Sequence, residues 1–183
     1  MINRLLHAMI AKFEKATDYD MGYGHEMLDI SRPAFLKFSK VTKLSLHRED
    51  VPAAAEYAAK LVATLAEDCG PCTQLVVGMA EKEGLSTTVL RGIIEGDVDA
   101  MDPDAALGWR FARAVLAHDL DADPLREEIA HRWGRRAVVS LALSIAASRM
   151  YPTVKYAMGH GRACARVKVG GVDARPLAAL ATA

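Results

Sequence analysis

The sequence predicts an all-α fold, a compact helical bundle. Along almost the whole chain, apolar residues recur at intervals of about three to four residues, the spacing that places side chains on one face of a helix. Short breaks containing glycine, proline or aspartate separate these periodic segments. Residues 165–169 form the one stretch whose pattern is compatible with a β-strand. Several periodic segments are rich in alanine, which favours close packing between helices.

Composition fits one soluble domain. The chain has 183 residues, enough for its own apolar core, and we expect residues 1–183 to form a single helical domain. With 51% hydrophobic residues, 25% charged residues and no net charge, nucleic acid or an anionic membrane is not the expected partner. Residues 1–15 lack a signal-peptide pattern, and residues 137–147 have about half the length that spans a bilayer. Three cysteines, an odd and low number, indicate the reducing cytoplasm.

Two helices are expected in an N-terminal extension, residues 1–48. A stripe of large apolar residues predicts an amphipathic helix over residues 3–16. Residues 19–24 contain two glycines and are expected to form a loop. A second helix is expected from about Ser31, because Pro33 then falls in the first turn.

Three helices are expected next, over residues 50–67, 69–84 and 86–96. Asp50 is the expected N-cap of the first, because a proline follows in what would be the first turn. Ser86 is the expected N-cap of the third. Glycines at the ends of the second and third are typical of helix C-termini.

The last helices are marked by proline and glycine. Asp-Pro dipeptides are expected to begin helices at Asp102 and Asp123. A glycine then separates these from a longer apolar helix over residues 135–150. Tyr151-Pro152 is expected to break that helix before a short final helical piece, because proline lacks the N–H that a helix interior needs.

A Cys-x-x-Cys pair, Cys69 and Cys72, lies where one predicted helix ends and the next begins. Pro71 suits a first helical turn, so both sulfurs should lie near a helix N-terminus. The positive end of the helix dipole favours thiolate over thiol there, which makes a better nucleophile and leaving group. Glu67 and Asp68 oppose this effect if they come close. The pattern indicates a pair that cycles between dithiol and disulfide.

Two other interpretations of the pair stay open. A zinc site would need further ligands, and His160 with Cys164 would complete a Cys3His set. Alternatively, the cysteines are small apolar core residues. A thioredoxin fold is not expected, because a helix and not a strand precedes the pair. No histidine lies within ten residues of either cysteine, so no base is provided locally.

The order of elements resembles a known family. Between residues 50 and 150, a helix runs into Cys-x-x-Cys, a second helix leads to Gly84-Leu85-Ser86, and a short helix ends at Gly96. This order resembles the alkylhydroperoxidase D and carboxymuconolactone decarboxylase superfamily. The resemblance implies a helical bundle of that type, with residues 50–150 as the family-like core, assembled into trimers or hexamers. It also implies that the cysteine pair reduces peroxides or exchanges disulfides.

The chain departs from that family at the proton relay. Family redox sites have a histidine four residues after the second cysteine, where this chain has Val76. They have a glutamate twelve residues before the first cysteine, where this chain has Tyr57, with Glu56 beside it. Cys69 and Cys72 therefore carry over as catalytic residues, and the relay does not. Candidate relay or site-lining residues are Glu56, Tyr57, Glu67, Asp68, Gln74 and Val76.

These observations predict a cytoplasmic dithiol/disulfide oxidoreductase that is at most a weak alkylhydroperoxidase. Its expected partners are a small peroxide or disulfide substrate, a thiol reductant and further copies of the chain, with no cofactor and no metal. The alternative is a non-catalytic oligomeric helical protein whose cysteine pair senses redox state or binds zinc. Sustained turnover of a reductant separates the two, because a sensor oxidises once and is not recycled.

Overall fold

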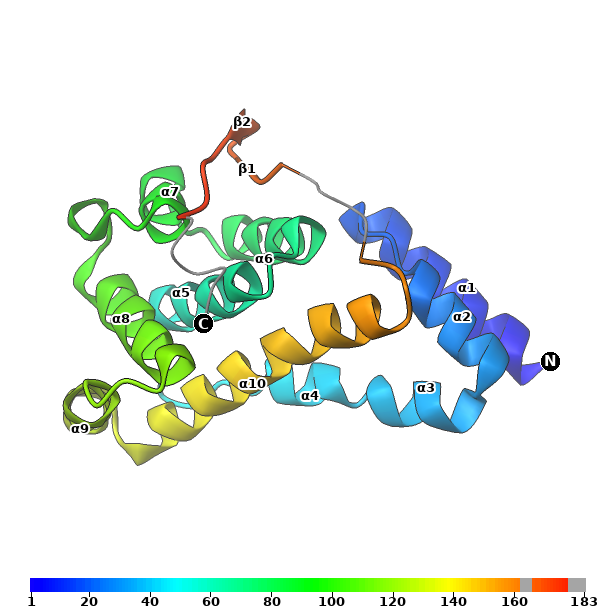
Figure 1. Ribbon diagram of the computed structural model, residues 1–183, viewed down its shortest axis with the longest axis horizontal. Helices are drawn as coiled ribbons and strands as arrows, with labels where there is room; N and C mark the ends of the chain where they lie inside the picture. Colours follow the sequence, from blue (N-terminus) through cyan, green and yellow to red (C-terminus); the bar gives the residue numbers. More distant parts are fainter. Residues whose placement is uncertain (162–165, 178–183) are drawn as a thin grey trace.

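The computed structural model describes residues 1–161 and 166–177, and it confirms the all-α prediction (Figure 1). The helices in the first half of the chain are α1 (Ile2–Thr17), α2 (Gly22–Ile30), α3 (Arg32–Phe38), α4 (Val41–Ser45), α5 (Ala53–Ala66), α6 (Gly70–Lys82) and α7 (Thr87–Glu95). The second half contains the 3-10 turn η1 (Val98–Ala100), then α8 (Pro103–Ala117), α9 (Ala122–Trp133) and α10 (Arg135–Ala157). A two-stranded antiparallel hairpin, β1 (Lys168–Val169) and β2 (Val172–Asp173), follows.

Helix α5 is the centre of the core. It packs against α6, α7, α8 and α10, and nearly all of its residues are buried. The approach to α8 is very close at Gly108, where a Cβ atom would lie 2.3 Å from the carbonyl oxygen of Ala55. The small residues of α5 and α8 therefore allow the two backbones to come into contact, which larger side chains would prevent.

The N-terminal helices form a separate part of the architecture. Helices α1 and α2 lie side by side away from the α5–α9 core, and α4 runs along α10 (Figure 1). A small buried cluster joins this part to the rest of the chain. It consists of Tyr19 and Tyr23 from the N-terminal part with Cys69 and Cys72 at the start of α6.

Most predicted helix ends are confirmed. The side chains of Ser31, Ser86 and Asp102 each accept hydrogen bonds from backbone N–H groups at the starts of α3, α7 and α8. Gly96 closes α7 in the left-handed conformation that favours glycine. The strand pattern at residues 165–169 is confirmed for Lys168–Val169, while residue 165 lies outside the described part of the chain.

The loop predicted at residues 19–24 is wrong in its second half. Helix α2 begins at Gly22, so both glycines lie inside a helix. A Cβ on Gly24 would lie 2.9 Å from the terminal methyl of Met21, a flexible side-chain end that can move aside. The apolar stripe of α1 also differs from expectation, because Ile10 is buried while several of its neighbours face solvent.

The N-cap prediction for Asp50 is wrong. Helix α5 starts at Ala53, and Asp50 adopts a positive φ of 60°. Its carboxylate instead accepts a hydrogen bond from the side chain of Arg136, 2.6 Å away on α10. The carboxylate therefore pairs with a distant arginine and does not make the helix-capping contact that the local pattern predicted.

The break predicted at Tyr151-Pro152 is also wrong, because α10 continues to Ala157 with Pro152 inside it. Contacts on both sides keep this segment helical. Tyr151 shares a hydrogen bond with Thr42, and the Thr153 hydroxyl donates one to the Glu67 carboxylate at 3.4 Å. Tertiary packing thus outweighs the loss of one backbone hydrogen bond at proline.

Helix α10 is long and apolar enough, by length and composition alone, to cross a bilayer. Core helices of soluble proteins meet the same criteria, so this is weak evidence for a membrane span. Its buried residues pack against α4, α5 and α9, so the helix predicted over residues 135–150 is part of the core.

Candidate functional site

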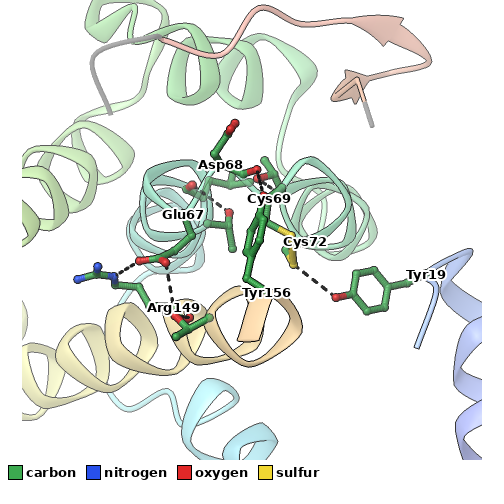
Figure 2. The surroundings of a disulfide bond; sticks show 11 residues. Tyr19, Glu67, Asp68, Cys69, Cys72, Arg149 and Tyr156 are labelled. Carbon is green, nitrogen blue, oxygen red and sulfur yellow. Dashed lines mark hydrogen bonds and ion pairs between the residues drawn. A yellow bond between two sulfur atoms is a disulfide. The ribbon is translucent and has the colours of Figure 1, made fainter. Parts of the chain in front are cut away.

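The cysteine pair occupies the first turn of α6, as predicted. Cys69 is the N-cap and Cys72 lies in the first turn, with Gly70-Pro71 between them. The two sulfurs are joined in a disulfide, with Cα atoms 5.3 Å apart (Figure 2). Each cysteine is only 4% exposed. The unpaired N–H groups at this helix start favour a thiolate once the disulfide is reduced.

The loop before the pair is held from α10 (Figure 2). The carboxylate of Glu67 pairs with Arg149, so it does not reach toward the sulfurs. Asp68 has a positive φ of 48°, and its carbonyl accepts a hydrogen bond from the Tyr156 hydroxyl at 3.0 Å. These contacts fix the backbone that leads into α6.

Tyr19 is the residue that sequence reasoning missed. Its hydroxyl lies 3.4 Å from the Sγ of Cys72, within hydrogen-bond distance for sulfur (Figure 2). Within residues 1–161 and 166–177, no other side-chain hydrogen bond to either sulfur is found. Burial raises the pKa of the Tyr19 phenol, so the phenol stays protonated near neutral pH and can donate a hydrogen bond. A tyrosine between two predicted helices carries no periodic signal that could have revealed this contact.

Lys155 lies over the aromatic ring of Tyr19. Its Nζ is 5.2 Å from the centre of the Tyr19 ring, on the face of the aromatic system. The side chain is only 2% exposed, and Nζ has no hydrogen-bond partner among the described residues. Burial lowers the pKa of this amine, because the charged form loses its hydration.

An apolar cavity of about 320 Å³ opens beside Cys72. Its walls come from the N-terminal helices, α5, α6 and α10, and no sequence pattern indicated it. Aromatic and aliphatic side chains dominate the lining, which includes Phe13, Tyr19, Phe35, Phe38, Leu75 and Met79. Cys72 is a lining residue and Cys69 is not. The cavity has the size and character of a site for a small apolar molecule.

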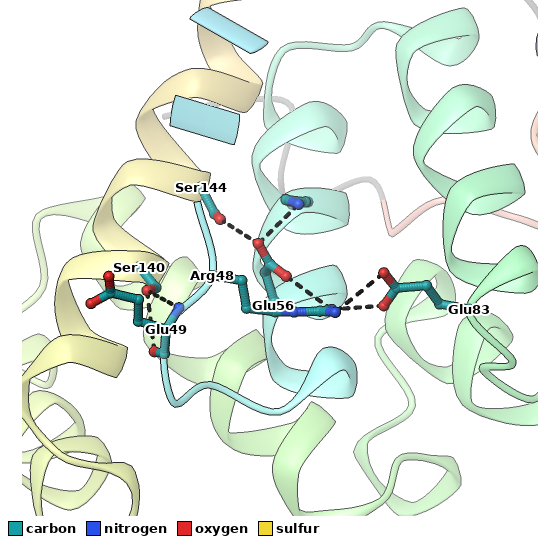
Figure 3. A network of polar contacts seen from close by, with 7 residues as sticks. Arg48, Glu49, Glu56, Glu83, Ser140 and Ser144 are labelled. Carbon is teal, nitrogen blue, oxygen red and sulfur yellow. Dashed lines mark hydrogen bonds and ion pairs between the residues drawn. The ribbon is translucent and has the colours of Figure 1, made fainter. Parts of the chain in front are cut away.

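Two candidate relay residues lie in a different polar network. Glu56 is 2% exposed and bonds Lys60 at 3.0 Å and Ser144 at 3.1 Å. Its second oxygen is 3.3 Å from Arg48, which also pairs with Glu83 (Figure 3). The carboxylate is thus fully engaged with these partners, and no described hydrogen bond joins it to a sulfur.

Tyr57 belongs to the same region as Glu56. Burial raises the pKa of its phenol to about 12, with the carboxylates of Glu83 and Glu56 adding to the effect. The Lys60 amine lies 5.1 Å from the centre of its ring. Tyr57 is therefore a neutral, packed side chain of the α5 network in the described structure.

Gln74 and Val76 have different roles. The Gln74 side-chain amide exchanges two hydrogen bonds with the backbone of Lys168, at 2.7 and 3.1 Å, and so attaches the β-hairpin to α6. Val76 lines the apolar cavity together with Cys72. Of the six relay or lining candidates, Val76 is the one that shares this cavity with a sulfur.

The proposed zinc ligands are not brought together in the described structure. His160 bonds the carboxylate of Glu26, and Cys164 lies outside the described residues. No group of three or more potential ligands forms a metal cluster in the part of the chain that is described. The zinc interpretation is thus left without support from these contacts.

Comparison with models of protein families, with curated proteins and with solved structures finds no match to this chain.

Proposed function

We propose that the protein is a dithiol/disulfide oxidoreductase that acts on small apolar disulfides and, more slowly, on alkyl hydroperoxides. One observation carries the proposal: the Cys69–Cys72 disulfide at a helix N-terminus has one of its sulfurs in the wall of an apolar cavity. Redox chemistry and substrate binding are thereby available at the same place. The resemblance to the alkylhydroperoxidase D-like family supports the same conclusion.

We propose different roles for the two sulfurs, because one of them lines the cavity and the other does not. Cys72 lines it and is the attacking thiolate, and Cys69, one turn earlier, resolves the intermediate. In a full cycle, two thiols lose two electrons and become one disulfide. A substrate disulfide becomes two thiols, or a hydroperoxide becomes an alcohol and water. A cytoplasmic thiol then returns the pair to the reduced state.

Peroxide reduction is the slower reaction because no imidazole or carboxylate bonds either sulfur among the described residues. A positioned base contributes about 10²–10⁴-fold to such steps. Disulfide exchange needs only a thiolate of suitable pKa. We therefore propose that the native chain prefers disulfide substrates.

The test is steady-state turnover with a thiol reductant in excess. Reduced protein should consume the uncharged 2,2′-dipyridyl disulfide faster than glutathione disulfide, because burying the charges of glutathione in an apolar cavity is costly. Cumene hydroperoxide should be consumed more slowly than either. Cys72→Ser should abolish all three activities, whereas Cys164→Ser serves as the matched cysteine control and should keep them. Absence of turnover in the native protein would refute the proposal.

One observation favours a second candidate function, a redox sensor without turnover. Both cysteines are 4% exposed, so a bulky reductant has little direct access to the disulfide. A sensor would oxidise once, and its free thiols would not be restored by excess reductant at a steady rate. Counting thiols during the same turnover assay separates this candidate from the oxidoreductase.

We also propose that the protein assembles into a homo-oligomer. One face of α1 exposes large apolar side chains to solvent: Ile2, Leu5, Met9 and Phe13. Exposed apolar stripes of this kind are typical of contact surfaces between proteins. The family resemblance implies closed trimers or hexamers, and such symmetric assembly would cover this face.

A further inference from the structure

We propose that Tyr19 is the proton donor at Cys72 in this reaction, and that Lys155 is a positioning residue that favours the Cys72 thiolate. The N-terminal extension would then supply a catalytic group that α5 and α6 do not provide. This inference rests on the proposed oxidoreductase function. It assigns a proton donor at Cys72 to a residue from a different part of the chain.

The Tyr19 hydroxyl is close enough to Cys72 to donate a proton there. It lies 3.4 Å from the sulfur that lines the cavity, and the ring is fixed by Phe13, whose ring centre is 6.4 Å away in an edge-to-face arrangement. A disulfide sulfur is a weak acceptor, but a thiolate is a strong one. The Tyr19–Cys72 contact should therefore become stronger when the disulfide is reduced.

Lys155 supplies the second, independent observation. Its buried amine has no hydrogen-bond partner among the described residues, and it faces the Tyr19 ring. A buried cation without an anion is unfavourable, and reduction to a Cys72 thiolate creates an anion next to the hydroxyl of that ring. The other ionisable groups that face Tyr19 are Asp20, Tyr23 and Tyr151, and Asp20 also faces Lys155.

The proton balance of the step follows from this arrangement. The Cys72 thiolate attacks one sulfur of the substrate disulfide, the substrate S–S bond breaks, and the departing thiolate takes the phenolic proton of Tyr19. The Cys69 thiol returns a proton to the phenolate and attacks the Cys72 sulfur. The disulfide closes and the second substrate thiolate leaves. That thiolate takes from water the proton that Cys72 released when it ionised.

The test measures the thiol pKa of Cys72 and needs no turnover. In the full chain with Cys69→Ser and Cys164→Ser, Cys72 is the one remaining cysteine. The rate of alkylation by iodoacetamide across pH then reports its ionisation. Tyr19→Phe should raise that pKa by about one, a tenfold change in the ionisation constant, because the thiolate loses a hydrogen-bond donor. Lys155→Met should raise it as well, through the loss of charge.

Tyr151→Phe is the matched control for the thiol pKa. Tyr151 lines the same cavity, but its hydroxyl bonds Thr42 and not sulfur. The Cys72 pKa should therefore be unchanged in this variant.

An unchanged Cys72 pKa in Tyr19→Phe, with the native protein still turning over, would refute this inference alone. Absence of turnover in the native protein, with the pKa raised in Tyr19→Phe but not in Tyr151→Phe, would refute the proposed oxidoreductase function alone. If Tyr19→Phe does not fold, Lys155→Met decides, and an unchanged pKa there overturns the proposal.

Discussion

The buried carboxylate of Glu56 provides a sharp test of whether this residue is structural or catalytic. We expect Glu56→Leu to reduce the free energy of unfolding by about 3–5 kcal/mol, the usual cost of removing one partner from a buried ion pair. The reason lies in Lys60, whose amine is 3.0 Å from the carboxylate and almost fully buried. Without the carboxylate, that amine has no anionic partner among the described residues. Arg48 is affected less, because it keeps Glu83 at 2.7 Å.

Two further variants distinguish the ion pair from simple packing. Lys60→Met should cost less than Glu56→Leu, because the carboxylate keeps Arg48 and Ser144 as partners. The double variant Glu56→Leu/Lys60→Met should be more stable than Glu56→Leu alone, because no unpaired charge remains; a coupling energy of about 0.5–3 kcal/mol is typical of such neighbours.

The assay is urea unfolding followed by circular dichroism, with the free energies compared at constant m-value. The reasoning would be refuted by a cost below about 1 kcal/mol for Glu56→Leu, or by a double variant no more stable than the single one. Enzymatic turnover tests whether Glu56 also has a catalytic role. Glu56→Gln, measured per folded molecule, should keep the native rate of disulfide turnover, whereas a loss of about 10²-fold would show that Glu56 belongs to a proton relay.

Four other predictions follow from the structure. Gly108→Ala should destabilise the fold by several kcal/mol in urea unfolding, because its Cβ would lie 2.3 Å from the Ala55 carbonyl oxygen; a cost below about 1 kcal/mol would contradict the close α5–α8 contact. Val76→His should raise cumene hydroperoxide turnover by up to about 10²-fold, because an imidazole would share the cavity with Cys72, and an unchanged rate would show that the position is not suited to a base. Burial lowers the pKa of the Lys155 amine, so as the pH rises toward 10.5 the folded chain loses this proton before the unfolded chain does. The native protein should therefore gain stability relative to Lys155→Met over this range. Parallel stability curves for the two proteins would contradict this. Light scattering at micromolar concentration should give a mass well above the 19.8 kDa monomer, and a monomeric mass would overturn the proposed assembly.

Much of the local structure could be predicted from the sequence, because local chemistry decides it. The start of α6 at Gly70 follows from the fixed φ of Pro71 and its missing N–H, and this start alone places both cysteines at a helix N-terminus. The caps at Ser86 and Asp102 follow from side chains that satisfy backbone groups within three residues. These features involve neighbours along the chain, so periodicity and capping patterns were sufficient.

The surroundings of the cysteines were decided only by the tertiary structure. Tyr19 reaches Cys72 across 53 positions of sequence, and Lys155 meets Tyr19 from the opposite end of the chain. The same packing keeps Pro152 inside α10, against its local preference. Single-sequence patterns report which face of a helix is apolar, but they do not report which distant side chain that face meets. The candidate nucleophile could therefore be predicted from the sequence, whereas its proton donor and its cavity depended on how distant helices pack.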